Sequence, residues 1–83
     1  MRIVFSQAAW DDYLHWRQMD RKMLQRIEGL IKECLRTSFA GRGKPEPLRG
    51  ELSGCWSRPI DLERRLVCRV EADALQIAQC RYH

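Results

Sequence analysis

The sequence predicts an α+β fold, in which a small antiparallel β-sheet carries two N-terminal helices on one face. Two long segments in the first half repeat apolar residues every three or four positions, as amphipathic helices do. Segments in the last third alternate in side-chain character and are joined by short turns, which is typical of antiparallel strands. The resulting order, β-α-α-β-β-β, separates helices from strands along the chain and favours the α+β class.

The size and charge of the chain restrict its class. Its 83 residues fit one domain, residues 1–83, and a chain this short buries only ~60% of its unfolded surface. Hydrophobic residues at 45% and charged residues at 31% favour a folded, soluble protein over a disordered one. The net charge of +4 favours an anionic partner, such as nucleic acid, an acidic protein segment or a phosphate-bearing ligand, without choosing among them.

The first predicted strand covers residues 3–5, and Ser6 follows it as a helix N-cap. A first helix then extends over about residues 7–16. Asp11 and Asp12 fall in its early turns, where the helix dipole favours negative charge. Its aromatic residues could form a platform for stacking bases, but the favoured interpretation is that they pack the helix against the sheet. These residues are Trp10, Tyr13 and Trp16.

A second helix is expected over residues 20–36, with Asp20 as its N-cap. It should end near Thr37, because two glycines and Pro45 follow. Its charged face is interpreted as solvated surface, which in an RNA-binding protein would add electrostatic attraction. The apolar stripe on the other face consists of Met23, Leu24, Ile27, Leu30, Ile31, Cys34 and Leu35.

The C-terminal part predicts three strands. The first, residues 56–60, contains Pro59, which indicates an edge strand or a strand end. The second, residues 64–71, alternates, and a turn at residues 72–73 leads to a last strand over about residues 75–82. One face of the second strand carries Leu66, Cys68 and Val70, and the other carries Arg65, Val67 and Arg69.

The cysteines and the N-terminus suggest a reduced, cytoplasmic protein. The four cysteines are far apart, without a CxxC pair, so we expect free thiols rather than a metal site. The opening MRIVFSQAAW has an apolar run too short for a signal peptide or a membrane span. No contact with a membrane is therefore expected. The cysteines are Cys34, Cys55, Cys68 and Cys80.

The stretch from Gly41 to Arg65 places a carboxylate among prolines and basic residues. Pro45 and Pro47 stiffen the chain around Glu46, because each proline fixes its own φ and favours extended geometry in the residue before it. A carboxylate held in this way suggests a functional group, although by itself it could be an ordinary turn residue.

The two histidines, His15 and His83, are further titratable candidates. His15 is expected on the surface of the first helix. His83 ends a strand beside Arg81 and Tyr82, and a histidine so placed is more often frayed and inert than functional.

Five stretches form a specific combination: FSQAAWDDYLHW (residues 5–16), FAGRGKPEPL (39–48), LSGCWSR (52–58), RLV (65–67) and CRYH (80–83). In these stretches the chain resembles the YoeB family, the toxins of the YoeB–YefM toxin–antitoxin pairs within the RelE superfamily. The resemblance covers essentially the whole chain. GKPEPL followed by LSGCWSR and a final RYH is more specific than a lone short motif.

The resemblance implies a ribosome-dependent endoribonuclease that cuts mRNA in the ribosomal A site and so inhibits translation. It implies a YefM-like antitoxin, the ribosome and mRNA as partners, a homodimer, and neither cofactor nor metal. The family pattern assigns a general base to Glu46, a transition-state-stabilising arginine to Arg65 and a general acid to His83.

These three roles suit RNA cleavage. The 2′-hydroxyl must lose a proton as it attacks the phosphate, charge builds on the phosphoryl oxygens, and the leaving 5′-oxygen must gain a proton. The planar guanidinium of an arginine can engage two phosphate oxygens together. The expected products are a 2′,3′-cyclic phosphate and a 5′-hydroxyl. The residues expected to contact the RNA are Lys44, Arg49, Arg58, Arg81 and Tyr82.

Two other functions stay open. A toxin of the RelE/ParE fold could act as a binding inhibitor, for instance of gyrase, without chemistry, and a basic nucleic-acid-binding module also fits the charge. Glu46 together with His83 favours the ribonuclease, because a pure binder needs neither base nor acid. The chain departs from the family at Pro59, where close members have a second basic residue, and after His83, where the family commonly continues with an aromatic residue.

The loop after Glu71 determines which face of the sheet His83 shares. A two-residue loop would pair Arg65 with Cys80 and point His83 away from Arg65. A three-residue loop would pair Arg65 with Arg81 and bring His83 to the Arg65 face. The catalytic interpretation therefore predicts an odd-length loop, or a bend with the same effect.

Overall fold

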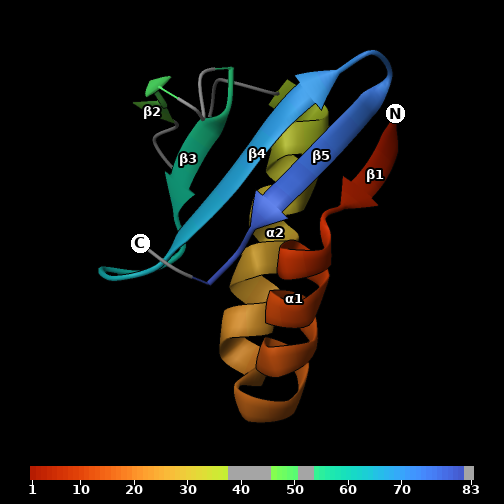
Figure 1. The fold of residues 1–83 in the computed structure, drawn as a ribbon. Helices are drawn as coiled ribbons and strands as arrows, with labels where there is room; N and C mark the ends of the chain where they lie inside the picture. The colour runs from red at the N-terminus through yellow and green to blue at the C-terminus, as the bar shows by residue number, and fades with distance from the viewer. Residues whose placement is uncertain (38–45, 51–53, 82–83) are drawn as a thin grey trace.

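The computed structural model describes residues 1–37, 46–50 and 54–81, which form two helices and five strands. Figure 1 shows both helices on the same side of the sheet. The α+β fold and the positions of both helices are therefore confirmed. The elements follow in the order β1 (Arg2–Phe5), α1 (Gln7–Met19), α2 (Arg21–Thr37), β2 (Glu46–Pro47), β3 (Trp56–Pro59), β4 (Arg65–Glu71) and β5 (Ala74–Gln79).

The sheet is mixed rather than fully antiparallel. Its strand order is β1-β5-β4-β3-β2, and the pairs among β3, β4 and β5 are antiparallel, as predicted. The short strand β2, which was not predicted, pairs antiparallel with β3. β1 instead runs parallel to β5, from Arg2 opposite Ala74 to Phe5 opposite Ile77. The expectation of a purely antiparallel sheet is corrected at this edge. β1 pairs with the distant end of the chain, so no local turn indicates its direction.

Polar side chains cap both helices at the predicted positions. The Oγ of Ser6 accepts a hydrogen bond from the backbone N–H of Ala9 at 3.0 Å, at the start of α1. The Oδ1 of Asp20 accepts one from the backbone N–H of Lys22, also at 3.0 Å, at the start of α2. α1 runs further than expected, to Met19, because the cap of α2 follows it directly.

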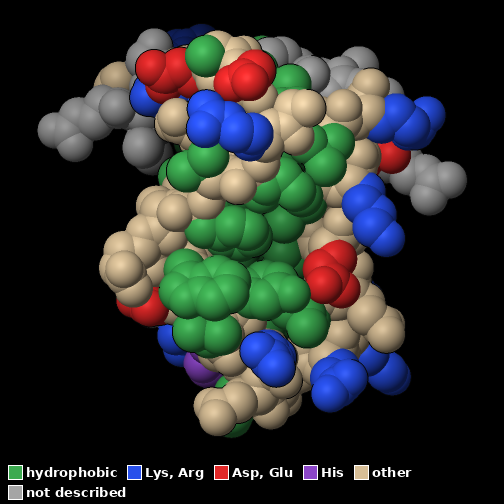
Figure 2. Space-filling model, turned by 90° about the vertical axis from the view of Figure 1, so that its right-hand side faces the viewer, with side chains coloured by type: hydrophobic (Ala, Val, Ile, Leu, Met, Phe, Trp, Pro, Cys, Tyr) green, Lys and Arg blue, Asp and Glu red, His purple; other side chains and the backbone are tan. Residues whose placement is uncertain are grey.

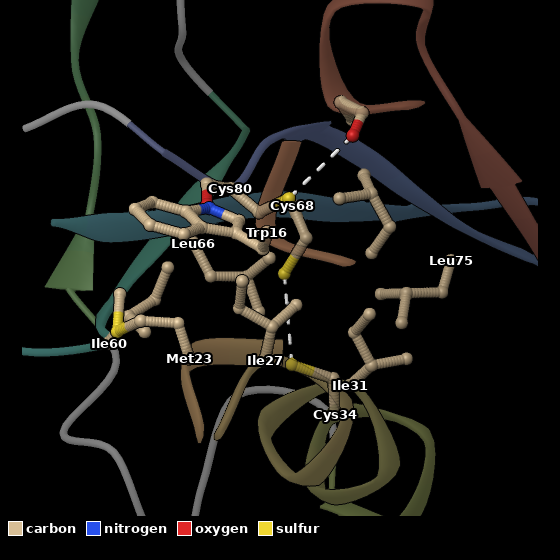
Figure 3. Packing of buried hydrophobic residues seen from close by; sticks show 12 residues of the cluster. Trp16, Met23, Ile27, Ile31, Cys34, Ile60, Leu66, Cys68, Leu75 and Cys80 are labelled. Carbon is tan, nitrogen blue, oxygen red and sulfur yellow. Dashed lines mark hydrogen bonds between the residues drawn. The ribbon is translucent and has the colours of Figure 1, made fainter. Parts of the chain in front are cut away.

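The apolar stripe of α2 packs against the helix-facing side of β4 and β5, as predicted (Figure 3). Ile27 and Leu66, at the centre of this contact, are both completely buried. The alternation along β4 is therefore confirmed on its apolar face. The buried cluster includes Met23, Ile27, Ile31 and Cys34 from α2, and Leu66, Cys68, Leu75 and Ile77 from the sheet.

The aromatic residues of α1 follow the favoured interpretation only in part, because Trp16 and Tyr13 pack against the core whereas Trp10 is 44% exposed. Trp16 is buried, and the rings of Trp10 and Tyr13 stack with centroids 5.6 Å apart. Phe5 meets both rings edge-on. Phe5, Trp10 and Tyr13 line a groove together with Ile3, and Figure 2 shows the hydrophobic surface on this side of the molecule.

All four cysteines are buried free thiols. Within the described residues, no three or more histidine, cysteine or acidic side chains gather in a metal-binding arrangement. Neither helix, over its described residues, is long and apolar enough to cross a membrane.

α1 holds the end of β5 through a buried carboxylate and an indole. Asp12 is only 5% exposed, and its Oδ2 accepts a hydrogen bond from the backbone N–H of Cys80 at 3.0 Å. The indole Nε1 of Trp16 donates to the carbonyl oxygen of Cys80 at 2.9 Å. Both backbone polar groups of this buried residue are thus satisfied by one helix. Asp12 therefore does more than balance the helix dipole: it fixes where the chain leaves the sheet.

Replacing Asp12 with alanine is expected to lower the free energy of unfolding by about 1–3 kcal/mol, because the buried N–H of Cys80 loses its acceptor. Urea unfolding measures this change. Asp11→Ala is the matched control, since Asp11 is exposed and, among the described residues, accepts a hydrogen bond only from its helix neighbour Gln7 at 3.0 Å. Equal losses of stability in the two variants would contradict this role of Asp12.

The hairpin between β4 and β5 has a two-residue turn, so of the two predicted alternatives, an odd-length loop or a bend with the same effect, the odd-length loop does not form. A β-bulge compensates for it. Cys68 lies opposite Ile77, but its neighbour Val67 lies opposite Gln79, which leaves Ala78 as the extra residue. Beyond the bulge the register is shifted by one residue, as a three-residue loop would have shifted it. The prediction about the face of His83 itself lies outside the described residues.

Candidate active site

Two of the three predicted catalytic residues lie on the same face of the sheet, opposite the helices. Glu46 is in the short edge strand β2, and Arg65 is the first residue of β4, with β3 between them. Leu66 points into the core, so Arg65 points the other way. The side chains meet across β3, with 3.7 Å between Arg65 Nη2 and Glu46 Oε1.

The two side chains differ in their access to solvent. The side chain of Glu46 is 69% exposed, whereas that of Arg65 is 19% exposed. The ion pair is weak, because its carboxylate is open to water and 3.7 Å separates the two charged atoms. Glu46 is therefore available to a ligand that approaches the face, and Arg65 forms the more rigid part of the site.

Ser57 of β3 lies between these residues and holds the guanidinium of Arg65. Its Oγ accepts a hydrogen bond from Arg65 Nε at 2.7 Å, and its carbonyl oxygen accepts one from Nη2 at 3.4 Å. Ser57 is directly opposite Glu46 in the β2–β3 ladder and is only 4% exposed. Ser57 was not among the site residues predicted from the sequence. Strand alternation could have found it, because Ser57 points away from Trp56 and Arg58 on either side.

Arg58 does not lie on this face. Its side chain is completely buried opposite Leu66, on the helix-facing side of the sheet. The pKa of Cys34 is lowered to about 7, mainly by the hydrogen bond between the thiols of Cys34 and Cys68. Burial acts in the opposite direction and raises this pKa, whereas the positive charge of Arg58 lowers it further. The position of Arg58 therefore does not fit the expected contact with RNA, because alternation along β3 turns Ser57 to the site instead.

The other predicted RNA-contacting residues are only partly covered by the structure. Arg49 follows β2 and is exposed, and Arg81 follows β5 and is partly buried. The predictions for Lys44, Tyr82 and His83 lie outside the described residues.

The arrangement combines an exposed carboxylate with an oriented guanidinium. A carboxylate can accept a proton, and a guanidinium can stabilise negative charge on phosphate oxygens. Within the described part of the chain, Nη1 of Arg65 has no hydrogen-bond partner, so the guanidinium keeps donors for a ligand. Proton removal and stabilisation of an anionic phosphate are therefore available side by side.

Comparison with known proteins places this chain in a family. Residues 5–83 match the family model described as the YoeB-like toxin of bacterial type II toxin–antitoxin systems. The toxin YoeB of Escherichia coli strain K12 is 52% identical over 83 residues, which is 100% of this chain and 99% of that protein. The toxin YoeB of Streptomyces coelicolor is 53% identical, with the same coverage.

Solved structures agree with this assignment. A YoeB/ParE toxin from Agrobacterium tumefaciens has a TM-score of 0.97 and 46% identity, and the match covers 100% of this chain and 99% of that one. A YoeB–YefM complex from Staphylococcus aureus contains a chain with a TM-score of 0.93 and 40% identity, covering 100% and 97%. With match and identity extending over nearly its whole length, the chain belongs to the YoeB family of type II toxin–antitoxin toxins.

Proposed function

We propose that this toxin is a ribosome-dependent endoribonuclease, which cuts mRNA in the ribosomal A site and thereby stops translation. Membership of a toxin family supports inhibition of a cellular process. The observation that carries the enzymatic part is the placement of Arg65 Nη2 at 3.7 Å from the exposed Glu46 carboxylate. A toxin that only binds its target has no need for a proton acceptor beside an oriented guanidinium.

In the proposed reaction, Glu46 removes the proton from a ribose 2′-hydroxyl. The 2′-oxygen then bonds to the adjacent phosphorus, and the bond from phosphorus to the 5′-oxygen breaks. Arg65 stabilises the charge that builds on the non-bridging oxygens. His83 gives a proton to the leaving 5′-oxygen. The products are a 2′,3′-cyclic phosphate and a 5′-hydroxyl.

The proposed partners follow from the charge and from the relatives. Solved Staphylococcus aureus proteins are described as a YoeB–YefM complex and as a YoeB dimer. We infer that a YefM-like antitoxin neutralises this toxin and that the toxin forms a homodimer. The net charge of +4 and the exposed Arg49 suit an acidic segment of the antitoxin or the RNA backbone. Action on the ribosome would place the protein in the cytoplasm.

A reconstituted translation system tests this function. Purified toxin is added during translation of a defined mRNA, and the 5′ ends of the fragments are mapped by primer extension. We expect new ends within codons held in the A site, and none when ribosomes are omitted. Translation that stops while the mRNA stays intact would show a binding inhibitor instead, and cleavage without ribosomes would contradict ribosome dependence.

The proposed acid can be tested through the leaving group. His83→Ala is expected to slow cleavage about a hundredfold, because the 5′-oxygen then leaves without a positioned proton donor. A substrate with sulfur in place of that 5′-oxygen should restore most of the rate, since a thiolate leaves without protonation. The same substrate should not rescue Glu46→Gln, which lacks the base. An equal deficit of His83→Ala on both substrates would exclude the acid role.

A further inference from the structure

Ser57 is placed where it can orient the side chain of Arg65. It lies in the middle strand of the three that build the candidate site, directly opposite Glu46. It is a polar residue with only 4% of its surface exposed, so little of it is available to a large ligand. A buried hydroxyl normally has a hydrogen-bond partner, and here the partner is the arginine.

The contacts restrict the guanidinium at two points. Nε donates to the Ser57 Oγ at 2.7 Å, and Nη2 donates to the Ser57 carbonyl oxygen at 3.4 Å. Nε and Nη2 lie along the same edge of the planar group, so one residue holds one edge. Nη1 is directed away from that edge and keeps its donors. An arginine side chain has many rotamers, and two contacts on one edge select among them.

We propose that Ser57 is a positioning residue for RNA cleavage, which holds Arg65 so that its remaining donors face the scissile phosphate. This inference rests on the proposed function. The guanidinium is then oriented before the substrate arrives. The entropy cost of fixing the Arg65 rotamer is therefore not added to the activation free energy of cleavage. Ser57 itself touches neither the RNA nor the reacting atoms. Its side chain is the only part of the contact that substitution can remove, because the backbone carbonyl stays.

Single-turnover cleavage on ribosomes with a defined codon in the A site tests this proposal. Ser57→Ala is expected to lower the rate at saturating toxin about 10- to 100-fold, because the guanidinium is no longer held in place. The toxin concentration that gives half the maximal rate should stay unchanged. Ser57→Thr keeps a hydroxyl and should stay within a few-fold of the original rate. Ser57→Cys, similar in size but a weaker acceptor, should resemble Ser57→Ala.

A double-mutant cycle separates positioning from a general structural role. In an Arg65→Ala background, Ser57→Ala should have no further effect, because there is no guanidinium left to orient. If the fold-losses in cleavage rate of the two single variants multiply in the double variant, the proposal is overturned. A rate for both Ser57→Ala and Ser57→Cys equal to that of the original protein would also overturn it. Thermal unfolding of each variant checks that it is folded at the assay temperature, so that the cleavage rates of folded proteins are compared.

A matched control lies further along β4. Arg69 Nε donates to the side-chain Oε1 of Gln76 at 3.2 Å, an arginine held by a neighbouring strand outside the candidate site. Gln76→Ala should leave the cleavage rate unchanged, and a loss as large as that of Ser57→Ala would contradict the assignment. The two hypotheses fail in different ways. If the original protein does not cleave, both hypotheses are wrong. If it cleaves and both Ser57→Ala and Ser57→Cys are equally fast, only the positioning role is wrong.

Discussion

Arg65→Ala is expected to lower the maximal rate of mRNA cleavage on ribosomes by about 10³-fold or more, with little change in ribosome affinity. An arginine that meets charge developing on a phosphoryl group contributes on this scale. Because that charge exists only in the transition state, the loss should appear in the rate at saturation rather than in binding. Single-turnover cleavage at increasing toxin concentration measures both quantities.

Two variants sharpen this result. Arg65→Lys keeps the positive charge but has no planar fork and cannot reproduce the two contacts with Ser57, so an intermediate rate is expected. Arg69→Ala removes another arginine of β4, one whose side chain is 42% exposed, and should cleave at the original rate. Weaker ribosome binding with an unchanged maximal rate in Arg65→Ala would make Arg65 a simple RNA contact.

Glu46→Gln is expected to lower the cleavage rate by about 10³- to 10⁴-fold, because the amide keeps the size of the carboxylate but cannot accept the 2′-hydroxyl proton. The residual rate should rise with pH, since hydroxide in solution would then have to remove the proton. Glu63→Gln, with a side chain that is 82% exposed and outside the site, is the control. An unchanged rate in Glu46→Gln would exclude Glu46 as the base.

The loss of activity expected for Glu46→Gln cannot be attributed to unfolding. The contact between Glu46 and Arg65 is 3.7 Å long, and the carboxylate side is 69% exposed. Open ion pairs of this kind contribute about 0–1 kcal/mol to stability. Glu46→Gln and its control should therefore unfold at nearly the same urea concentration. A large loss of stability in Glu46→Gln would mean that the ion pair is structural.

The helices could be predicted because their signals are local. Ser6 and Asp20 each satisfy N–H groups within the next turn, and the apolar spacing of α2 identifies its buried face without knowledge of the partner. The direction of β1 could not be predicted, because its pairing with β5 joins opposite ends of the chain. Local patterns identify an element but not a distant neighbour.

The candidate site was only partly predictable for a similar reason. Glu46 was singled out by the prolines beside it, and the family pattern added Arg65. Ser57 and Arg58 are adjacent and differ in face, so a motif that contains both does not show which one reaches the site. The bulge at Ala78 was equally hidden, because an extra residue in one strand is visible only when the partner strand is known.

The chemical ends of the mRNA fragments test the central claim most directly. Fragments released by this toxin from ribosomes with a defined A-site codon can be analysed by mass spectrometry. If Glu46 activates the 2′-hydroxyl beside Arg65, the upstream fragment ends in a 2′,3′-cyclic phosphate and the downstream fragment begins with a 5′-hydroxyl. An upstream 3′-hydroxyl with a downstream 5′-phosphate, or translation that stops with intact mRNA, would contradict the proposed reaction.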